Sequence, residues 1–424
     1  MLKKILGTIV SKGLTAICNF LVVILTANYL GAEGRGEIAI IVLGLTIVNL
    51  FQTIVGGPAL VYLTSRHHFF SLLILSYLWT VLISIIVSII LVFFHLYPLE
   101  YFYDLIGLSL IQGVLSTHQF LLLGKEKIKE QNILEVLKSL SSVVFILFFF
   151  LVSQNISIQA FIYSTYIAFT IPLLISCIYV FKHIGSFRLE NAKILIADFF
   201  KYGFSIQLNN ISQMFNYRFC FYLLEKSHGT AVVGIFSVAV SISEAAWVIC
   251  RSIATIQYSR ISNSHDDNYK KDLTVSFSKL SLLATIPVLA IMLLLPDSIF
   301  QNLFGRDFAY IQPLIGSLSG GVLFMSFLII INHYYSGNGK YYINTIGSLI
   351  GNIVILILGF VLIPRYAAIG AGFVSSLSYL AMLIYYVVLF SSEQKIKYSL
   401  FIPGKQDMAR TIAEIQKAIR RDRQ

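Results

Sequence analysis

Twelve apolar runs, each 18 to 28 residues long, constrain this fold more than any other feature of the sequence. A bilayer-spanning helix needs about 20 apolar residues, whereas a spanning strand needs about 10. Because a segment in lipid must satisfy its own backbone hydrogen bonds, the runs predict an all-α polytopic membrane protein of about twelve transmembrane helices. They lie at 8–30, 36–63, 70–94, 103–123, 135–152, 157–181, 202–224, 231–253, 277–296, 312–335, 343–363 and 368–390.

The distribution of basic residues predicts the orientation of these helices. With the N-terminus placed inside, 26 of the 31 Lys and Arg fall in inner connections or tails and only four in outer connections. The positive-inside rule therefore places both termini in the cytoplasm. It also explains the net charge of +11 without a nucleic-acid partner, because no basic stripe interleaved with aromatic residues occurs.

The connections divide the chain into domains. The long inner connection 182–201 is predicted to be a linker between an N-terminal six-helix bundle, 1–181, and a C-terminal six-helix bundle, 202–390. Two parallel halves that face each other across a central cavity are a common plan of transporters. No outer connection exceeds roughly fifteen residues, so we expect no large domain on the outer side.

The two halves carry traces of a repeat. Gly31 and Gly36 introduce the second helix, and Gly229 and Gly234 introduce the eighth with the same spacing, 198 positions later. Because each pair occupies the same topological position in its half, the spacing favours an internal duplication.

The basic tail 391–424 contains Met408, Ile412, Ile415 and Ile419 at helical spacing. One interpretation is an amphipathic helix on the lipids of the cytoplasmic leaflet. The alternative is a solvated tail without a function.

Motifs of known chemistry do not occur in the sequence. The four cysteines lie in apolar runs without CxxC spacing, and HExxH, GxSxG and GxxxxGK[ST] are missing. We therefore predict no metal site, no cofactor and no catalytic residue, which indicates a protein that is not an enzyme.

Charged residues inside the runs are the first candidates for a site. Arg218 lies inside the seventh run, where a charge costs about 3 kcal/mol, so it should face water or a partner. Glu244 lies near the middle of the eighth run, and Arg251 follows on the same face, where snorkelling to headgroups is the alternative. A depth difference of about 10 Å between Arg218 and Glu244 favours two separate roles over a structural ion pair.

Amide side chains supply further candidates. They are Asn49 and Gln52 in the second run, and Gln207, Asn209, Gln213 and Asn216 in the seventh. Such residues should be enclosed by protein or water, and hydrogen bonding between helices is the alternative to a role in binding. The sequence Gly56–Gly57–Pro58 after Gln52 predicts a break in the second helix.

These side chains suit one kind of substrate. A cavity with Arg218, joined by Arg35 or Arg251, matches the oxygens of a pyrophosphate, while amides and tyrosines match sugar hydroxyls. Glu244 is the candidate for coupling to H⁺ or Na⁺.

Several stretches then resemble a known family. They are YGFSIQLNNISQMFNYRFCFYLLEKSHGTAVVGIFSVAVSISEAAWVICRSIATIQYSRIS, LGAEGRGEIAI, LFGRDF, SGNGK and GNIVILILGFVLIPRYAAIGAGFVSSLSY. In order and spacing they are similar to O-antigen flippases of the multidrug/oligosaccharidyl-lipid/polysaccharide (MOP) exporter superfamily, over most of the chain. One departure is Cys220, because the family often has an Asp two residues after the Arg of NYR.

The resemblance implies a MATE-like pair of bundles that moves an undecaprenyl-pyrophosphate-linked oligosaccharide from the cytoplasmic to the periplasmic leaflet of the bacterial inner membrane. It implies alternating access driven by an ion gradient, and the polymerase and chain-length proteins of glycan assembly as partners. A lipid II or multidrug exporter of the same superfamily is the nearest alternative. A membrane-embedded glycan polymerase is disfavoured, because such an enzyme would need a sizeable outer loop.

Overall fold

The computed structural model describes residues 2–401 except 65, 185, 186, 188, 263, 265 and 310; the side chains of 2–9, 58, 201–206, 209, 259 and 399 are also outside the description. The tail residues Met408 to Ile419, for which an amphipathic helix was one interpretation, lie outside the described residues. All regular elements of the described part are helical, which confirms the predicted all-α class.

The N-terminal half contains α1 (Leu2–Gly56), α2 (Pro58–Leu63), α3 (Phe69–Phe93), η1 (Leu99–Tyr101), α4 (Phe102–Gly124), α5 (Ile128–Leu147), η2 (Phe148–Val152) and α6 (Ile158–Phe181). The C-terminal half contains α7 (Ala192–His228), α8 (Thr230–Ala245), α9 (Trp247–Ser262), α10 (Asp267–Leu294), α11 (Asp297–Phe304), η3 (Arg306–Phe308), α12 (Ile311–Gly337), α13 (Tyr341–Gln394) and η4 (Tyr398–Phe401).

Backbone breaks divide the two longest helices into the predicted spans. Within α1, Gly31 has φ 69°, a conformation that glycine adopts at little cost, and it separates the first predicted span from the second. Within α13, Ala367 has φ 48° and separates the last two spans. The predicted break after Gln52 is confirmed, because α1 ends at Gly56 and Pro58 opens α2. The predicted twelve-span pattern therefore accounts for the observed helices.

The helices form two compact units. Unit 1 comprises Met1–Ile211 together with Gly229–Ser237 and Gln301–Phe308, and unit 2 comprises Ser212–His228, Val238–Phe300 and Ala309–Gln424. Unit 1 thus includes two short segments from the second half of the chain.

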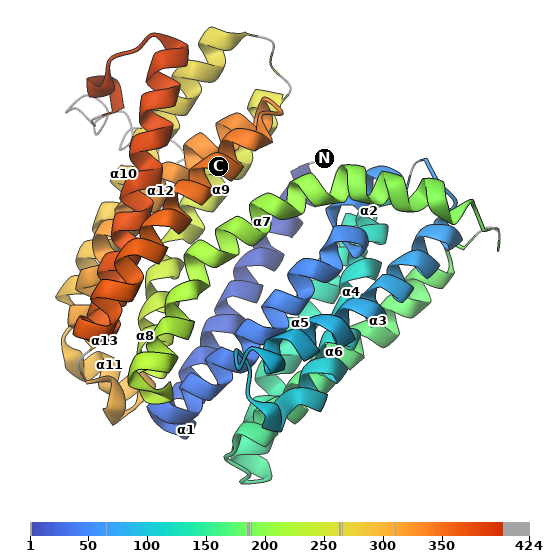
Figure 1. Ribbon diagram of the computed structural model, residues 1–424, viewed down its shortest axis with the longest axis horizontal. Coiled ribbons are helices and arrows are strands. Elements are labelled where there is room, and N and C mark those ends of the chain that lie inside the picture. Colours follow the sequence, from blue (N-terminus) through green and yellow to red (C-terminus); the bar gives the residue numbers. More distant parts are fainter. Residues whose placement is uncertain are drawn as a thin grey trace, which may run out of the picture. The chain divides into compact units, whose positions relative to one another are not determined.

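In unit 1, α1 packs against α3, α4 and α5, and α6 packs against α4 and α5 (Figure 1). Small polar residues let α3 approach its neighbours closely: Ser76, Thr80, Ser84 and Ser88, four residues apart, are all fully buried. Gly113 of α4 meets this face, because a Cβ there would contact Thr80 and Gln52. Without a hydrophobic force between helices in lipid, such close packing stabilises the bundle.

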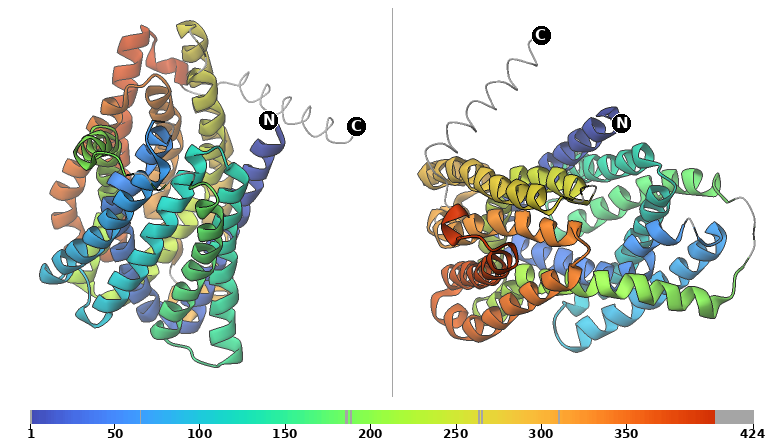
Figure 2. Two further views of the ribbon diagram at one scale, coloured as in Figure 1. Left: turned by 90° about the vertical axis from the view of Figure 1, so that its right-hand side faces the viewer. Right: turned by 90° about the horizontal axis from the view of Figure 1, so that it is seen from above.

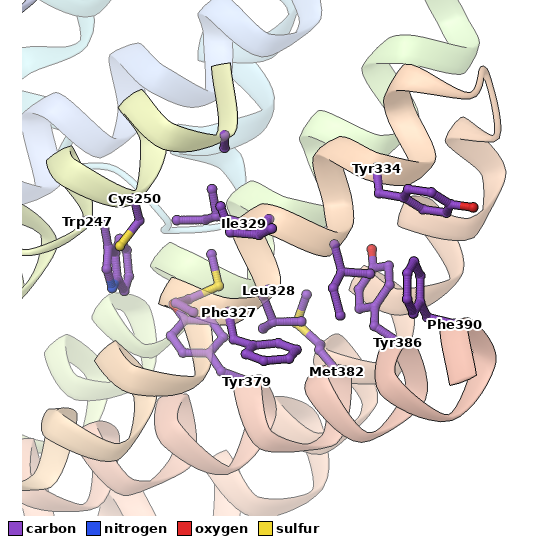
Figure 3. Close-up of a cluster of buried hydrophobic side chains, with 14 of the residues drawn as sticks. Trp247, Cys250, Phe327, Leu328, Ile329, Tyr334, Tyr379, Met382, Tyr386 and Phe390 are labelled. Atoms are coloured by element: carbon purple, nitrogen blue, oxygen red, sulfur yellow. The ribbon is translucent and has the colours of Figure 1, made fainter. Parts of the chain in front are cut away.

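In unit 2, α12 packs against α9, α10 and α13, and Figure 2 shows these helices from two further sides. Aromatic residues fill the space between them (Figure 3). Trp247 of α9 donates its indole N–H to the carbonyl oxygen of Val322 at 3.2 Å, so the buried polar atom is satisfied. The rings of Tyr334 and Phe390 meet edge to face at 4.8 Å between centroids.

Candidate functional site

Two of the charged residues that the sequence places inside the spans, Arg218 and Glu244, meet in unit 2. The Nη2 of Arg218 lies 3.3 Å from Oε1 of Glu244, so the side chains form an ion pair between α7 and α8. The predicted depth difference of about 10 Å, which disfavoured a direct pair, is therefore wrong.

The helix ends explain this difference. Helix α7 continues to His228 and α8 starts at Thr230, with only Gly229 at φ 83° between them. Counted from this turn, Arg218 and Glu244 differ by four residues of helix, or about 6 Å of rise. A long arginine side chain can bridge this difference in height. The sequence analysis overestimated the difference because it ended the seventh helix several residues too early.

The ion pair is partly accessible. The side chain of Arg218 is 33% exposed and that of Glu244 is 27% exposed. The Arg218 guanidinium also lies 5.4 Å from the ring of Phe221, a cation–π distance. An accessible arginine held by a carboxylate can exchange that carboxylate for another oxyanion, such as a phosphate.

Tyr217, beside Arg218, belongs to an aromatic cluster at the same level of unit 2. Its ring centroid lies 6.2 Å from Trp247 and 6.1 Å from Tyr379. Trp247 and Tyr379 are buried, so they form a rigid wall and only Tyr217 is partly accessible.

Arg251 does not share a straight helix with Glu244. The predicted eighth helix is bent by 44° between α8, which ends at Ala245, and α9, which starts at Trp247. The inference of a common face assumed a continuous helix, and the bend interrupts that helix between the two residues. Arg251 is exposed on α9.

Asn216 joins α7 to both arms of α13 instead of facing open space. Its Nδ2 donates to the carbonyl oxygen of Ser348 at 2.7 Å and to Oδ1 of Asn352 at 2.5 Å, and its Oδ1 accepts from Ser378 at 2.7 Å. Asn216 is 1% exposed. Gly351 makes room for this network, because a Cβ there would overlap Oδ1 of Asn216. The observed contacts match the alternative of hydrogen bonding between helices.

Amides of unit 1 are bound in the same manner. Gln52 is 1% exposed and donates to Ser84 at 2.8 Å and to the carbonyl oxygen of Ser109 at 3.0 Å. Gln207, also 1% exposed, donates to the carbonyl oxygen of Leu50 at 2.6 Å. Asn49 is half-buried and lies 3.5 Å from Oε1 of Gln52.

Three further candidates complete the predicted set. Arg35 is 8% exposed in unit 1 and contacts Oγ1 of Thr26 at 3.5 Å, so it lies inside the unit. Gln213 is half-buried on α7. The side chain of Asn209 lies outside the described part. The structure therefore brings Arg218 and Glu244 together but does not gather the whole predicted set.

A buried histidine in unit 1 was not singled out from the sequence. His118 is fully buried; its Nε2 bonds the hydroxyl of Tyr77 and its Nδ1 lies 2.6 Å from Oγ of Ser176. Since Ser176 uses its own hydrogen for the carbonyl oxygen of Leu173, Nδ1 carries the ring hydrogen. The only signal in the sequence was a lone histidine inside an apolar run.

Cys220, where the resembling family often has an Asp, is 1% exposed and lies 3.7 Å from Oγ of Ser375. This position is packed against α13, and the carboxylate that pairs with Arg218 is Glu244 on α8.

A second polar cluster lies at the cytoplasmic end of unit 1. His67 contacts Oε2 of Glu190 at 2.7 Å through Nδ1 and Oδ2 of Asp198 at 3.1 Å through Nε2. The backbone N–H of His68 donates to Glu190 at 3.1 Å. His67, His68 and Glu190 border a cavity of about 530 Å³. The contacts of this cluster attach the linker ahead of α7 and the start of α7 to the turn between α2 and α3.

Glu190→Gln should lower the thermal stability of this attachment by about 1 kcal/mol at neutral pH, the contribution of one partly exposed ionic hydrogen bond. Burial acts to raise the pKa of Glu190, but the hydrogen bonds from His67 and His68 outweigh it and the pKa is lowered. A lowered folded-state pKa gives stability above the ordinary value of 4.5 that is lost as pH falls through the folded value.

The measurement is thermal unfolding in detergent between pH 4 and 7, with the exposed Glu126→Gln on a neighbouring cytoplasmic turn as control. The difference between wild type and Glu190→Gln should shrink toward the acidic end. A difference that grows on acidification would contradict this role.

With the geometry in view, comparisons with known proteins place the chain in a family. The sequence model of the family described as "Polysaccharide biosynthesis protein" matches residues 1–265. The capsular polysaccharide biosynthesis protein CapF of Staphylococcus aureus is 27% identical over 168 residues, 39% of this chain and 42% of CapF. The uncharacterized membrane protein MJ1068 of Methanocaldococcus jannaschii is 29% identical over 139 residues, 32% of this chain and 27% of MJ1068. The matched region spans less than half of either relative.

Solved structures share the fold. The lipid II flippase MurJ in an inward closed conformation superposes with a TM-score of 0.75 at 15% identity, covering 94% of this chain and 89% of MurJ. An inward-facing multidrug resistance MATE family transporter of the MOP superfamily gives a TM-score of 0.69 at 11% identity, covering 90% and 96%. At this identity the likeness shows the fold alone. The multi-pass membrane fold predicted from the sequence is confirmed, as is the resemblance to the MOP superfamily.

Proposed function

Because this chain belongs to the polysaccharide biosynthesis protein family, we propose that it is a flippase rather than an enzyme. In this proposal it moves an undecaprenyl-pyrophosphate-linked O-antigen repeat unit from the cytoplasmic to the periplasmic leaflet of a bacterial inner membrane. The observation that carries the proposal is the accessible Arg218–Glu244 pair inside the spans of unit 2. A scaffold would not need to keep a costly charge pair open.

Arg218 is assigned to the pyrophosphate. Its planar guanidinium offers two parallel N–H donors that match phosphate oxygens, and phosphate is a stronger competitor than a single carboxylate oxygen at 3.3 Å. Exposed Arg251 and half-buried Gln213 are proposed as further contacts of the headgroup or sugar. The more deeply buried candidates, Asn216 among them, are proposed to support the site only indirectly, as are Arg35, Asn49, Gln52, Gln207 and Asn209.

Glu244 is assigned to ion coupling. When pyrophosphate takes the guanidinium, the carboxylate loses its counter-charge inside the membrane, and binding H⁺ or Na⁺ restores neutrality. Each transport step would then be linked to one ion. Alternating access between the two leaflets is the mechanism proposed for the cycle.

Glu244→Gln is therefore expected to remove the ion dependence of transport, because an amide cannot exchange a proton or hold a sodium ion. The measurement is uptake or flipping of a lipid-linked oligosaccharide in vesicles with imposed H⁺ or Na⁺ gradients. Asp297→Gln on the outer turn serves as the carboxylate control. If Glu244→Gln keeps the wild-type dependence on the gradient, the coupling role is rejected.

A lipid II exporter is the second candidate, and the structural likeness to MurJ favours it. Complementation separates the two. The chain should rescue a strain lacking its O-antigen flippase, measured as surface glycan and as the leaflet of the lipid-linked repeat unit. If the chain instead rescued a MurJ-deficient strain and not the strain that lacks its O-antigen flippase, lipid II would be favoured as the substrate. The glycan polymerase and chain-length proteins are proposed as partners only if the chain rescues the strain that lacks its O-antigen flippase.

A further inference from the structure

Three of the motifs noted in the sequence meet at the outer end of unit 1. The break of α1 in LGAEGRG, the start of α8 in GTAVVG and the η3 turn in LFGRDF belong to the same compact unit. The last two come from the second half of the chain, yet their segments Gly229–Ser237 and Gln301–Phe308 pack with the first half.

The contact between α1 and α8 is reciprocal. A Cβ on Gly36 would overlap the carbonyl oxygen of Thr230, and a Cβ on Gly234 would overlap the carbonyl oxygen of Ala32. Thr230 and Ala32 are themselves 198 positions apart, the same shift that relates Gly234 to Gly36. The two halves therefore contact each other through equivalent residues, as in a two-fold interface. The backbones can approach this closely only because both helices have glycine at the crossing.

The turns that lead into this crossing are equivalent as well. Gly31 has φ 69° and Gly229 has φ 83°, so both are glycines in the left-handed region. They lie 198 positions apart, the shift of the internal repeat expected from the sequence.

Asp307 of η3 makes a polar contact with α1 next to this crossing. Its Oδ2 accepts a hydrogen bond at 3.0 Å from the backbone N–H of Ala32, the first residue after the break in α1. That N–H has no partner within the restarted helix, so Asp307 acts as its cap from 275 residues away. Before the break, Nδ2 of Asn28 donates to the carbonyl oxygen of Leu303 at 3.3 Å.

We infer that the Gly36–Gly234 crossing and the Asp307–Ala32 hydrogen bond together form the outer gate of the transport cycle. The inference rests on the proposed function, since only a transporter by alternating access needs such a gate. Helix α8 continues from Ser237 into unit 2, and α11 begins in unit 2 at Asp297. The second half therefore cannot leave α1 at the outer end unless both contacts open.

Asp307→Asn and Gly36→Ala should each shift the protein toward the outward-open state. For Asp307→Asn the expected shift is about tenfold, the effect of weakening one charge-assisted hydrogen bond. The reporter is Thr26→Cys, fully buried beside the break, in a background without the four native cysteines. Its labelling by a membrane-impermeant maleimide from the outer side should rise in both variants.

Gly316→Ala is the matched control, because a Cβ there meets nothing within 4 Å. Labelling of Thr26→Cys should remain at the wild-type level in this variant. Unchanged labelling in both Asp307→Asn and Gly36→Ala would overturn the gate. Since labelling does not depend on the substrate, this readout remains valid even if the proposed substrate is wrong.

A disulfide tests whether the gate must open during transport. Asn28→Cys combined with Leu303→Cys should cross-link on oxidation and stop surface-glycan assembly in a flippase-deficient strain, and reduction should restore it. Each single cysteine should have no such effect. Wild-type glycan assembly by fully cross-linked protein would overturn the gate while leaving the flippase proposal intact, and failure of the uncross-linked protein to support glycan assembly would count against the flippase proposal instead.

Discussion

Arg218→Ala is expected to reduce surface-glycan assembly by at least about tenfold while the protein remains in the membrane at normal levels. Charge-assisted hydrogen bonds of this kind contribute about 1.5–3 kcal/mol each, and a substrate pyrophosphate would lose them all. Arg218→Lys should also be impaired, because an ammonium group cannot present two parallel donors to a phosphate. The measurement is complementation of a flippase-deficient strain, with membrane protein quantified in parallel.

A charge exchange separates this role from a purely structural one. Arg218→Glu combined with Glu244→Arg keeps one cation and one anion in the same two helices, so the ion pair can re-form. Stability should recover relative to either single change, but glycan assembly should not. Recovery of assembly in the exchanged protein, or wild-type assembly in Arg218→Ala, would remove Arg218 from the substrate site.

Asn216→Leu should destabilise unit 2 by about 3 kcal/mol, because it removes several hydrogen bonds at once from a low-dielectric interior. The amide of Asn216 serves Ser348, Asn352 and Ser378 at once. The measurement is thermal unfolding of the purified protein in detergent, followed by the loss of monodisperse protein.

Thr345→Val on α13 is the control, because the hydroxyl of Thr345 bonds only to the carbonyl oxygen of Tyr341 in its own helix. It should leave the melting temperature nearly unchanged. If Asn216→Leu also melted like wild type but lost transport, Asn216 would belong to the binding site directly and its structural assignment would be wrong.

Much of the secondary structure could be predicted, because a segment that crosses a lipid bilayer must satisfy its own backbone hydrogen bonds and is therefore helical. Helix length and the positive-inside rule determined the spans and their direction. The positions of glycine and proline then predicted the breaks at Gly31 and at Gly57–Pro58. At these positions the residue type itself favours a non-helical backbone or a helix end. The break between the last two spans was also predicted, with Pro364 close by, but its exact position at Ala367 was not, since an alanine at φ 48° is held by its surroundings rather than by its own preference.

The site was harder to predict for two geometric reasons. Hydrophobicity ends a helix where polar residues begin, but α7 continues through Glu225 and Lys226 to His228, which changed the depth assigned to Arg218. Periodicity also assumes a straight helix axis, but the axis bends by 44° between α8, which carries Glu244, and α9, which carries Arg251. Whether an amide such as Gln52 faces a neighbour or a cavity depends on which helices pack together, and a single sequence does not contain that information.

Helix α7 belongs to both units, because Ala192 to Ile211 lies in unit 1 and Ser212 to His228 in unit 2. A continuous helix resists twisting and can yield only by bending or by giving up backbone hydrogen bonds over a turn or two. Helix α7 is therefore a stiff connection and not a flexible linker. Arg218, seven residues past the boundary, is therefore carried on the same helix as Ala192–Ile211, with no loop between them.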